Sequence, residues 1–89
     1  MNVEFDKSFE KWLAKIEDSG TLKKIEQIIL QAEDAKSIAE IKNVRKLTGF
    51  KKYYRIKLGN YRLGFERINS TTIRFIIVAN RKDIYLRFP

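Results

Sequence analysis

The chain is short and basic, with 89 residues and a net charge of +8, and it contains neither cysteine nor histidine. This length supports one hydrophobic core, so we predict a single domain over residues 1–89, and the missing residue types exclude disulfide frameworks, thiolate metal sites and the commonest catalytic base. The mixed, charged N-terminus and the lack of any bilayer-length apolar stretch favour a cytoplasmic protein.

The chain opens with a predicted strand and helix. Residues 2–5 have the composition of a short strand, and Asp6 or Ser8 can cap the helix that follows. Apolar residues between positions 9 and 16 recur with helical spacing and form one stripe. We expect Asp-Ser-Gly at 18–20 to end this helix.

A second helix is predicted to start at Thr21. Its apolar stripe runs from residue 22 to residue 32, and polar side chains occupy the opposite side. A sheet needs such a cover, so we expect both helices to pack against one as an antiparallel pair. Residues 34–52 are less regular and predict a helical turn followed by a loop.

The second half of the chain changes to a period of two, which is typical of strands. The predicted strands are 53–58, 61–68, 72–79 and a short one at 84–88. We therefore predict an α+β fold in which two N-terminal helices pack on one face of a roughly four-stranded, mainly antiparallel sheet. The other face is then available for function.

The Gly59-Asn60 turn sets the register of the first hairpin. A two-residue turn places Leu58 opposite Tyr61, and alternation then sorts the two faces. Tyr54, Ile56, Leu63 and Phe65 share the face toward the helices. The other face receives Arg55, Lys57, Arg62 and Gly64.

Like charges on directly opposed residues are destabilising, so we expect a ligand to use these cations. Glycine weakens a strand interior, and we expect Gly64 to leave space for that ligand beside Arg55. Neither Lys57 nor Arg62 is expected to be needed for the core. The alternative is that the long side chains spread into water at small cost.

The net charge supports an anionic ligand. Residues 1–44 hold seven lysines and nine acidic residues, a net charge of −2, whereas residues 45–89 hold twelve Lys or Arg and two acids, a net charge of +10. Such a field attracts polyanions, and nucleic acid is the first candidate. The charge also serves solubility, so composition alone leaves both interpretations open.

The next turn can hold two or three residues. We favour three, because this sets Arg74 opposite Glu66 as a cross-strand ion pair. The chain then leaves the sheet through Arg81 and Lys82, and Tyr85 follows. We expect this segment to bring a second cationic cluster and an exposed aromatic ring near the hairpin.

Three segments resemble the RelE/ParE superfamily of bacterial toxins. They are RKLTG at 45–49, YYRIKLGNYRLGFE at 53–66 and NRKDIYLRFP at 80–89. The resemblance implies the toxin of a toxin-antitoxin pair that is inhibited by a cognate antitoxin protein. RelE-like members cut mRNA in the ribosomal A site, whereas ParE-like members poison DNA gyrase and lack the basic catalytic set.

The resemblance also implies roles for individual residues. It places the catalytic cations at Arg55, Lys57, Arg62 and Arg81, and the terminal aromatic at Tyr85. The chain has arginine at position 55, where lysine is common in the family, and Asn80 where histidine is common.

These residues suit metal-independent RNA cleavage by the 2′-hydroxyl of the RNA. A lysine is a base only when neutral, and the neighbours of Lys57 disfavour its charged form. Arg55 and Arg62 would hold the phosphate, and Arg81 would complete the clamp or assist the leaving oxygen. Tyr85 is expected either to stack a base or to lie in the core.

Six further cations of the second half are predicted to contact the RNA backbone, or else to form a solvated surface. They are Arg45, Lys46, Lys51, Lys52, Lys82 and Arg87. No metal or other cofactor is expected. The sequence therefore predicts a ribosome-dependent mRNA endoribonuclease toxin, with a gyrase poison and a non-enzymatic RNA-binding module as the alternatives.

Overall fold

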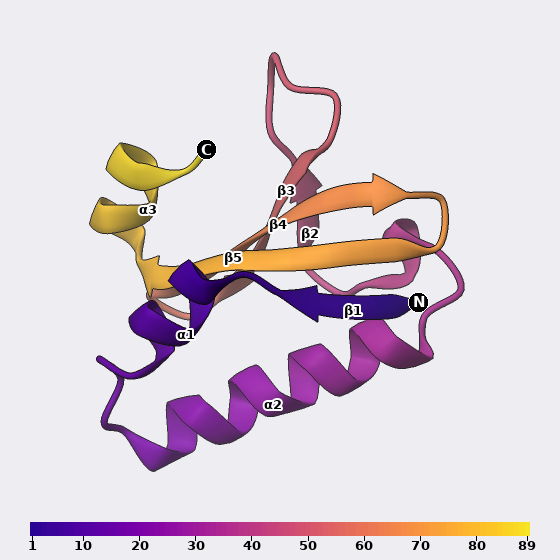
Figure 1. Ribbon diagram of the computed structural model, residues 1–89. Coiled ribbons are helices and arrows are strands. Elements are labelled where there is room, and N and C mark those ends of the chain that lie inside the picture. The colour runs from indigo at the N-terminus through magenta and orange to yellow at the C-terminus, as the bar shows by residue number, and fades with distance from the viewer.

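The computed structural model describes residues 1–89 and has a five-stranded sheet with helices on both faces (Figure 1). The strand order is β1-β5-β4-β3-β2, with β1 parallel to β5 and every other pair antiparallel. The strands are β1 (Asn2–Phe5), β2 (Val44–Lys46), β3 (Tyr53–Leu58), β4 (Tyr61–Asn69) and β5 (Thr72–Asn80). The predicted α+β class is confirmed, with one more strand than expected.

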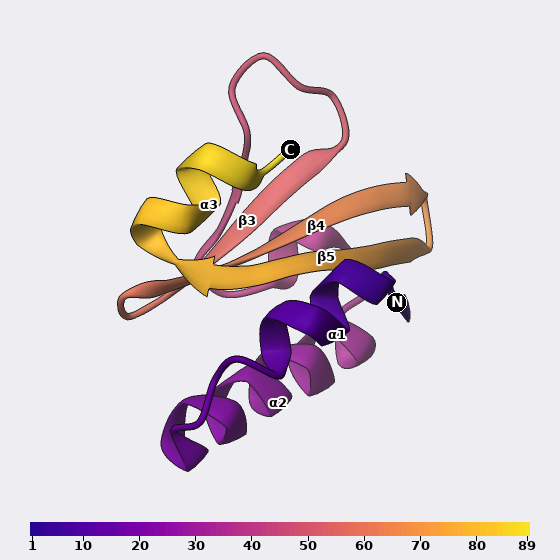
Figure 2. The ribbon, with the colours of Figure 1, turned by 60° about the vertical axis from the view of Figure 1, so that its left-hand side comes forward.

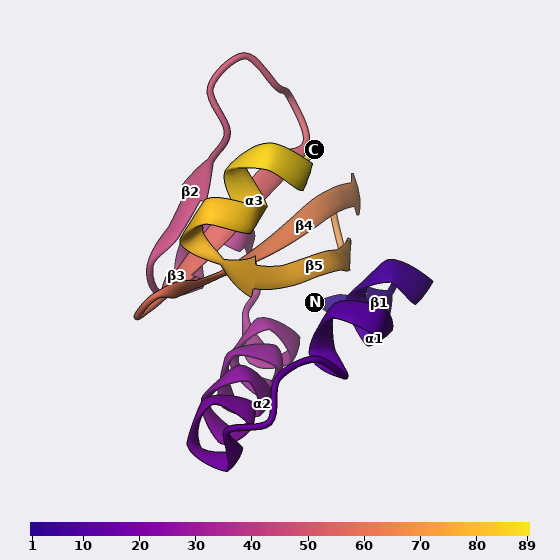
Figure 3. The ribbon, with the colours of Figure 1, turned by 90° about the vertical axis from the view of Figure 1, so that its left-hand side faces the viewer.

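Three α-helices flank the sheet. They are α1 (Lys7–Leu13), α2 (Ser19–Asp34) and α3 (Arg81–Arg87), and a short 3-10 helix, η1, spans Ile38–Glu40. The two N-terminal helices lie on one side of the sheet, as predicted, and α3 lies on the other (Figure 2, Figure 3). No helix has the length and apolar character required to cross a bilayer.

An aspartate caps each N-terminal helix. The Asp6 carboxylate accepts a hydrogen bond from the Ser8 amide at 3.0 Å, and the Asp18 carboxylate accepts one from the Thr21 amide at 2.8 Å. The side-chain and backbone hydrogen bonds from Thr21 lower the pKa of Asp18. The prediction that Asp-Ser-Gly ends the first helix is therefore wrong, because Asp18 begins the second.

The main core lies between the sheet and the two N-terminal helices. Phe9 of α1 and Ile25 of α2 are almost fully buried in this core. The sheet contributes Ile56, Leu63, Phe65, Ile73 and Phe75, none of which is exposed. The alternation predicted for the hairpin is confirmed, because its apolar residues face the helices.

A smaller core lies on the opposite face, under α3. It is formed by Ile77, Ala79, Ile84 and Phe88. The strand predicted at 84–88 is wrong, since this segment is helical and both edges of β5 are already paired, with β4 and β1. The Asn80 side chain caps α3 by accepting a hydrogen bond from the Asp83 amide at 3.0 Å.

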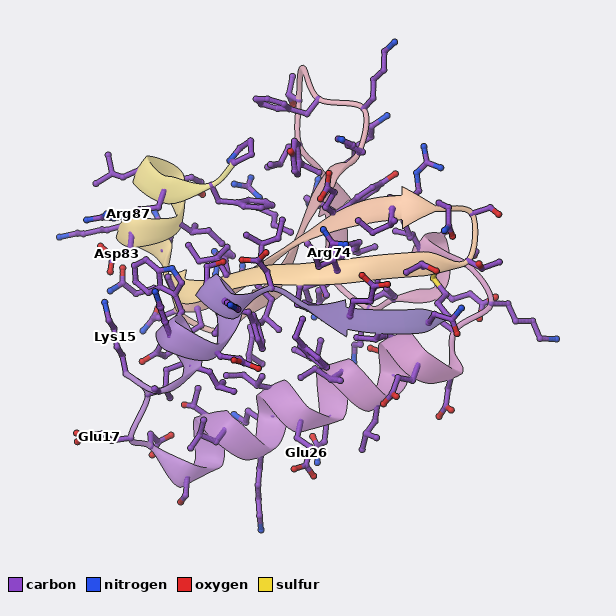
Figure 4. The ribbon with its side chains drawn as sticks, in the orientation of Figure 1. Lys15, Glu17, Glu26, Arg74, Asp83 and Arg87 are labelled. Atoms are coloured by element: carbon purple, nitrogen blue, oxygen red, sulfur yellow. The ribbon has the colours of Figure 1, made fainter.

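Three further features of the sheet differ from the expectation. Residues 44–46, predicted as loop, form β2 and pair with β3. Glu66 does lie opposite Arg74, but the loop has two residues because a bulge shifts the register between Arg67 and Asn69. The predicted ion pair is also wrong: Arg74 lies on β5 (Figure 4) and pairs with Glu4 at 3.0 Å.

Candidate nucleic-acid site

The sheet face that carries α3 changes from charged to apolar along two rows of paired residues. One row is Arg45, Arg55, Gly64 and Ile77; the next is Lys57, Arg62 and Ala79. Paired residues in adjacent strands project to the same face. The apolar ends of both rows lie on β5 and belong to the core under α3. The charged residues of the rows, on β2, β3 and β4, lie outside this core.

This charged part of the face is hollowed into a cavity of about 540 Å³, which we call the cationic cavity. Its lining residues are Asn43, Val44, Arg45, Arg55, Lys57, Arg62 and Tyr85. Four of them are cations and none is acidic. The register predicted from the hairpin turn is confirmed residue by residue, and it brings Arg55, Lys57 and Arg62 together here.

Arg62 is the most enclosed cation of the cavity, with 8% of its surface exposed. Its Nη1 donates hydrogen bonds to the carbonyl oxygens of Gly59 and Tyr61, both at 2.8 Å. Arg62 belongs to neither hydrophobic core, in line with the expectation, but its two bonds tie down the hairpin turn, which the sequence did not predict. Its other guanidinium nitrogens make no hydrogen bond within the protein and remain available to a ligand.

Tyr85 and Arg55 form a pair at the wall of the cavity. The Arg55 guanidinium carbon lies 5.2 Å from the centroid of the Tyr85 ring, within the range of a cation–π contact. Tyr85 is 57% exposed, so the alternative of a core tyrosine is wrong. The pairing orients Arg55 and presents an aromatic surface beside the cations.

Gly64 serves the small core rather than a ligand. A Cβ atom at this position would lie 2.7 Å from Cγ2 of Ile77 and 2.8 Å from the Phe88 ring. Real Cβ atoms do not approach other atoms so closely, so glycine is needed for α3 to pack here. The expectation that Gly64 leaves space for a ligand is wrong, because Phe88 fills that space.

Arg81 does not line the cationic cavity. It is exposed at the first position of α3, where its amide donates to the Asn60 carbonyl at 2.9 Å. This bond holds the start of α3 next to the hairpin turn. Lys82 and Arg87 are also exposed on α3 and outside the cavity lining, and Figure 4 shows Arg87 on that helix.

The other predicted RNA contacts are divided among three places. Arg45 lines the cavity. Lys46 pairs with Tyr54 and so lies on the opposite face. Lys51 is exposed in the β2–β3 loop, whereas Lys52 forms an ion pair with Glu66 at 3.0 Å, and the hydrogen bond and charge of Glu66 raise the pKa of Lys52.

Asn43, which was not among the predicted site residues, lines the cavity beside Lys57. Asn43 has a φ of 63°, and its carbonyl accepts a hydrogen bond from the Lys57 amide at 3.2 Å. Asparagine adopts this left-handed conformation more readily than most residues. The sequence signal for this residue is an asparagine shortly before the cationic pair at 45 and 46.

Comparison with known proteins places this fold among small toxins. The toxin in the RelB-RelE antitoxin-toxin complex of Methanococcus jannaschii superposes with a TM-score of 0.80 and 38% identity, over 97% of this chain and 99% of that one. The isolated RelE toxin of E. coli shares the fold, with a TM-score of 0.65, 23% identity and coverage of 96% and 90%.

The sequence comparison identifies the family. Toxin RelE3 of Methanocaldococcus jannaschii is 40% identical over 90 residues, with full coverage of both chains. The chain therefore belongs to the RelE family of toxins. No family model matches it.

Proposed function

We propose that this protein is the toxin of a toxin-antitoxin pair and that it cleaves mRNA on the ribosome as a metal-independent endoribonuclease. The cationic cavity carries this proposal. Four cations surround about 540 Å³ without an acidic side chain among them, which suits a phosphodiester and offers no carboxylate ligand for a metal ion.

The reaction uses the 2′-hydroxyl of the RNA as nucleophile. Lys57 accepts its proton, the 2′-oxygen bonds to phosphorus, and the bond to the 5′-oxygen breaks. The products are a 2′,3′-cyclic phosphate and a 5′-hydroxyl, whose proton comes from a water molecule that in turn takes back a proton from Lys57. Arg55 and the free nitrogens of Arg62 stabilise the charge that develops on the phosphoryl oxygens.

The aromatic wall of the cavity would orient the RNA. Base stacking on an aromatic side chain contributes roughly 1–3 kcal/mol in proteins that bind single strands. Tyr85 is exposed and held against Arg55, so one pair of residues can contact both a base and its phosphate. Arg81, which lies outside the cavity lining, would contact RNA only at the rim.

An antitoxin is the proposed protein partner. The similar toxin of Methanococcus jannaschii was solved as a complex of RelB and RelE. We infer that a cognate antitoxin binds this chain and covers the cationic cavity, since a phosphate site can be inhibited by occupying or screening its cations.

Induced expression of the chain without an antitoxin tests the function. The wild-type protein should arrest growth, and primer extension should show transcripts cut in the ribosomal A site. Lys57→Ala should abolish cutting, because it removes the base. Lys36→Ala, which changes an exposed lysine outside the cavity, should cut like the wild type.

Two results would overturn the assignment. Cutting by Lys57→Ala at the wild-type rate would remove Lys57 from the mechanism. Growth arrest with intact transcripts, DNA breaks and induced repair would instead identify a gyrase poison.

A further inference from the structure

A second hollow adjoins the cationic cavity at the end of β3. Its volume is about 490 Å³. We call it the flank groove; it is lined by Lys24, Gln27, Ile28, Gln31, Lys42, Asn43, Lys57 and Leu58. Asn43 and Lys57 line both hollows. The two hollows therefore adjoin at these residues, and we call the pair the track.

The chain geometry at Asn43 keeps this junction in place. Its left-handed backbone turns the chain from the loop into β2, and its carbonyl holds the Lys57 amide at 3.2 Å. Lys42 is exposed just before this turn, while Lys24 is exposed on α2. The groove is thus lined by residues of β3 and by residues of α2, which lies on the other side of the sheet from the cationic cavity.

We propose that the flank groove binds the single-stranded RNA that continues from the scissile nucleotide. Resting on the proposed function, this assigns Lys24 and Lys42 to backbone phosphates. The amides of Gln27 and Gln31 contact a base edge or a 2′-hydroxyl, since an amide both donates and accepts hydrogen bonds.

The lining favours RNA over an acidic protein segment. A strand with one phosphodiester in the cationic cavity carries its next phosphate a single nucleotide away, and the shared residue Lys57 leads directly into the flank groove. The groove lining holds three lysines and no acid, so a polyanion meets no repulsion there. Its apolar residues, Ile28 and Leu58, are too few to seat an amphipathic helix.

Fluorescence anisotropy with labelled single-stranded RNA of two and eight nucleotides tests the groove. We compare the wild type, Lys24→Ala/Lys42→Ala and a control, Lys23→Ala/Lys36→Ala. The control removes the same charge from exposed lysines that line no part of the track. Thermal unfolding verifies that each variant is folded.

The flank variant should bind the eight-nucleotide RNA on the order of tenfold more weakly, and the magnitude of its salt slope should fall by about 1.4, or 0.7 for each lost phosphate contact. Binding of the dinucleotide should not change. The control should match the wild type with both RNAs. Equal loss in the control, or wild-type binding by the flank variant, would overturn the proposal.

Three further outcomes distinguish a failure of the groove proposal from a failure of the nuclease proposal, and RNA from an acidic protein partner. If the flank variant loses affinity as expected but the wild type cuts no transcript in cells, the groove stands and the nuclease assignment fails. If the wild type cuts transcripts but the flank variant binds RNA normally, only the groove fails. A polyglutamate peptide that displaces the eight-nucleotide RNA at equal charge concentration would overturn the RNA assignment in favour of an acidic protein.

Discussion

Arg62 stabilises the hairpin turn and also lines the cationic cavity. The pairing rule predicted its position opposite Lys57, and the structure confirms it. The rule could not predict the bonds to Gly59 and Tyr61, because they depend on how the guanidinium folds back along its own hairpin. Two residues that look equivalent in the sequence therefore differ in the contacts that they make within the protein.

Substituting Arg62 and Lys57 one at a time should show how much each side chain contributes to the stability of the fold. Arg62→Ala should lower the free energy of unfolding by about 1–3 kcal/mol, because two charge-assisted hydrogen bonds to carbonyl oxygens of the hairpin turn are lost. Lys57→Ala should change it by less than about 0.5 kcal/mol, since that side chain is exposed. Urea denaturation measures both. Equal stability of the two variants would contradict the structural role of Arg62.

The helix α3 determines which part of the sheet face remains available. It covers the apolar ends of the two rows and leaves the charged ends open. The sequence contained the signals for this helix: Asn80 and Asp83 form a capping pair, and Ile84 and Phe88 are spaced one helical turn apart. The strand prediction failed because a short apolar and aromatic segment satisfies both patterns.

A methyl group at Gly64 should disturb α3. Gly64→Ala should destabilise the protein by about 1–3 kcal/mol, because the new Cβ would overlap Ile77 and Phe88. Combining it with Phe88→Ala should give less destabilisation than the sum of the two single changes. Chemical denaturation of the four proteins completes this cycle. Additive effects would show that Gly64 does not make room for Phe88.

Acidic and basic residues of the molecule are concentrated in different layers of the fold. The helices of the acidic first half cover one face, and the basic second half builds most of the sheet and its open face. The sequence predicted this division, the hairpin register and three cavity cations, since each follows from local pattern. It did not predict β2, the residue Asn43 or the exclusion of Arg81 from the cavity, since those depend on how distant segments pack.

The ends of the cut RNA report the proposed chemistry. Purified protein is added to ribosomes paused on a defined mRNA, and the fragments are analysed for their terminal groups. Attack by the 2′-hydroxyl predicts a 2′,3′-cyclic phosphate on the upstream fragment and a 5′-hydroxyl on the downstream one, with neither formed by Lys57→Ala. A 5′-phosphate, which requires attack by water, or an mRNA that stays intact, would contradict cleavage by the cationic cavity.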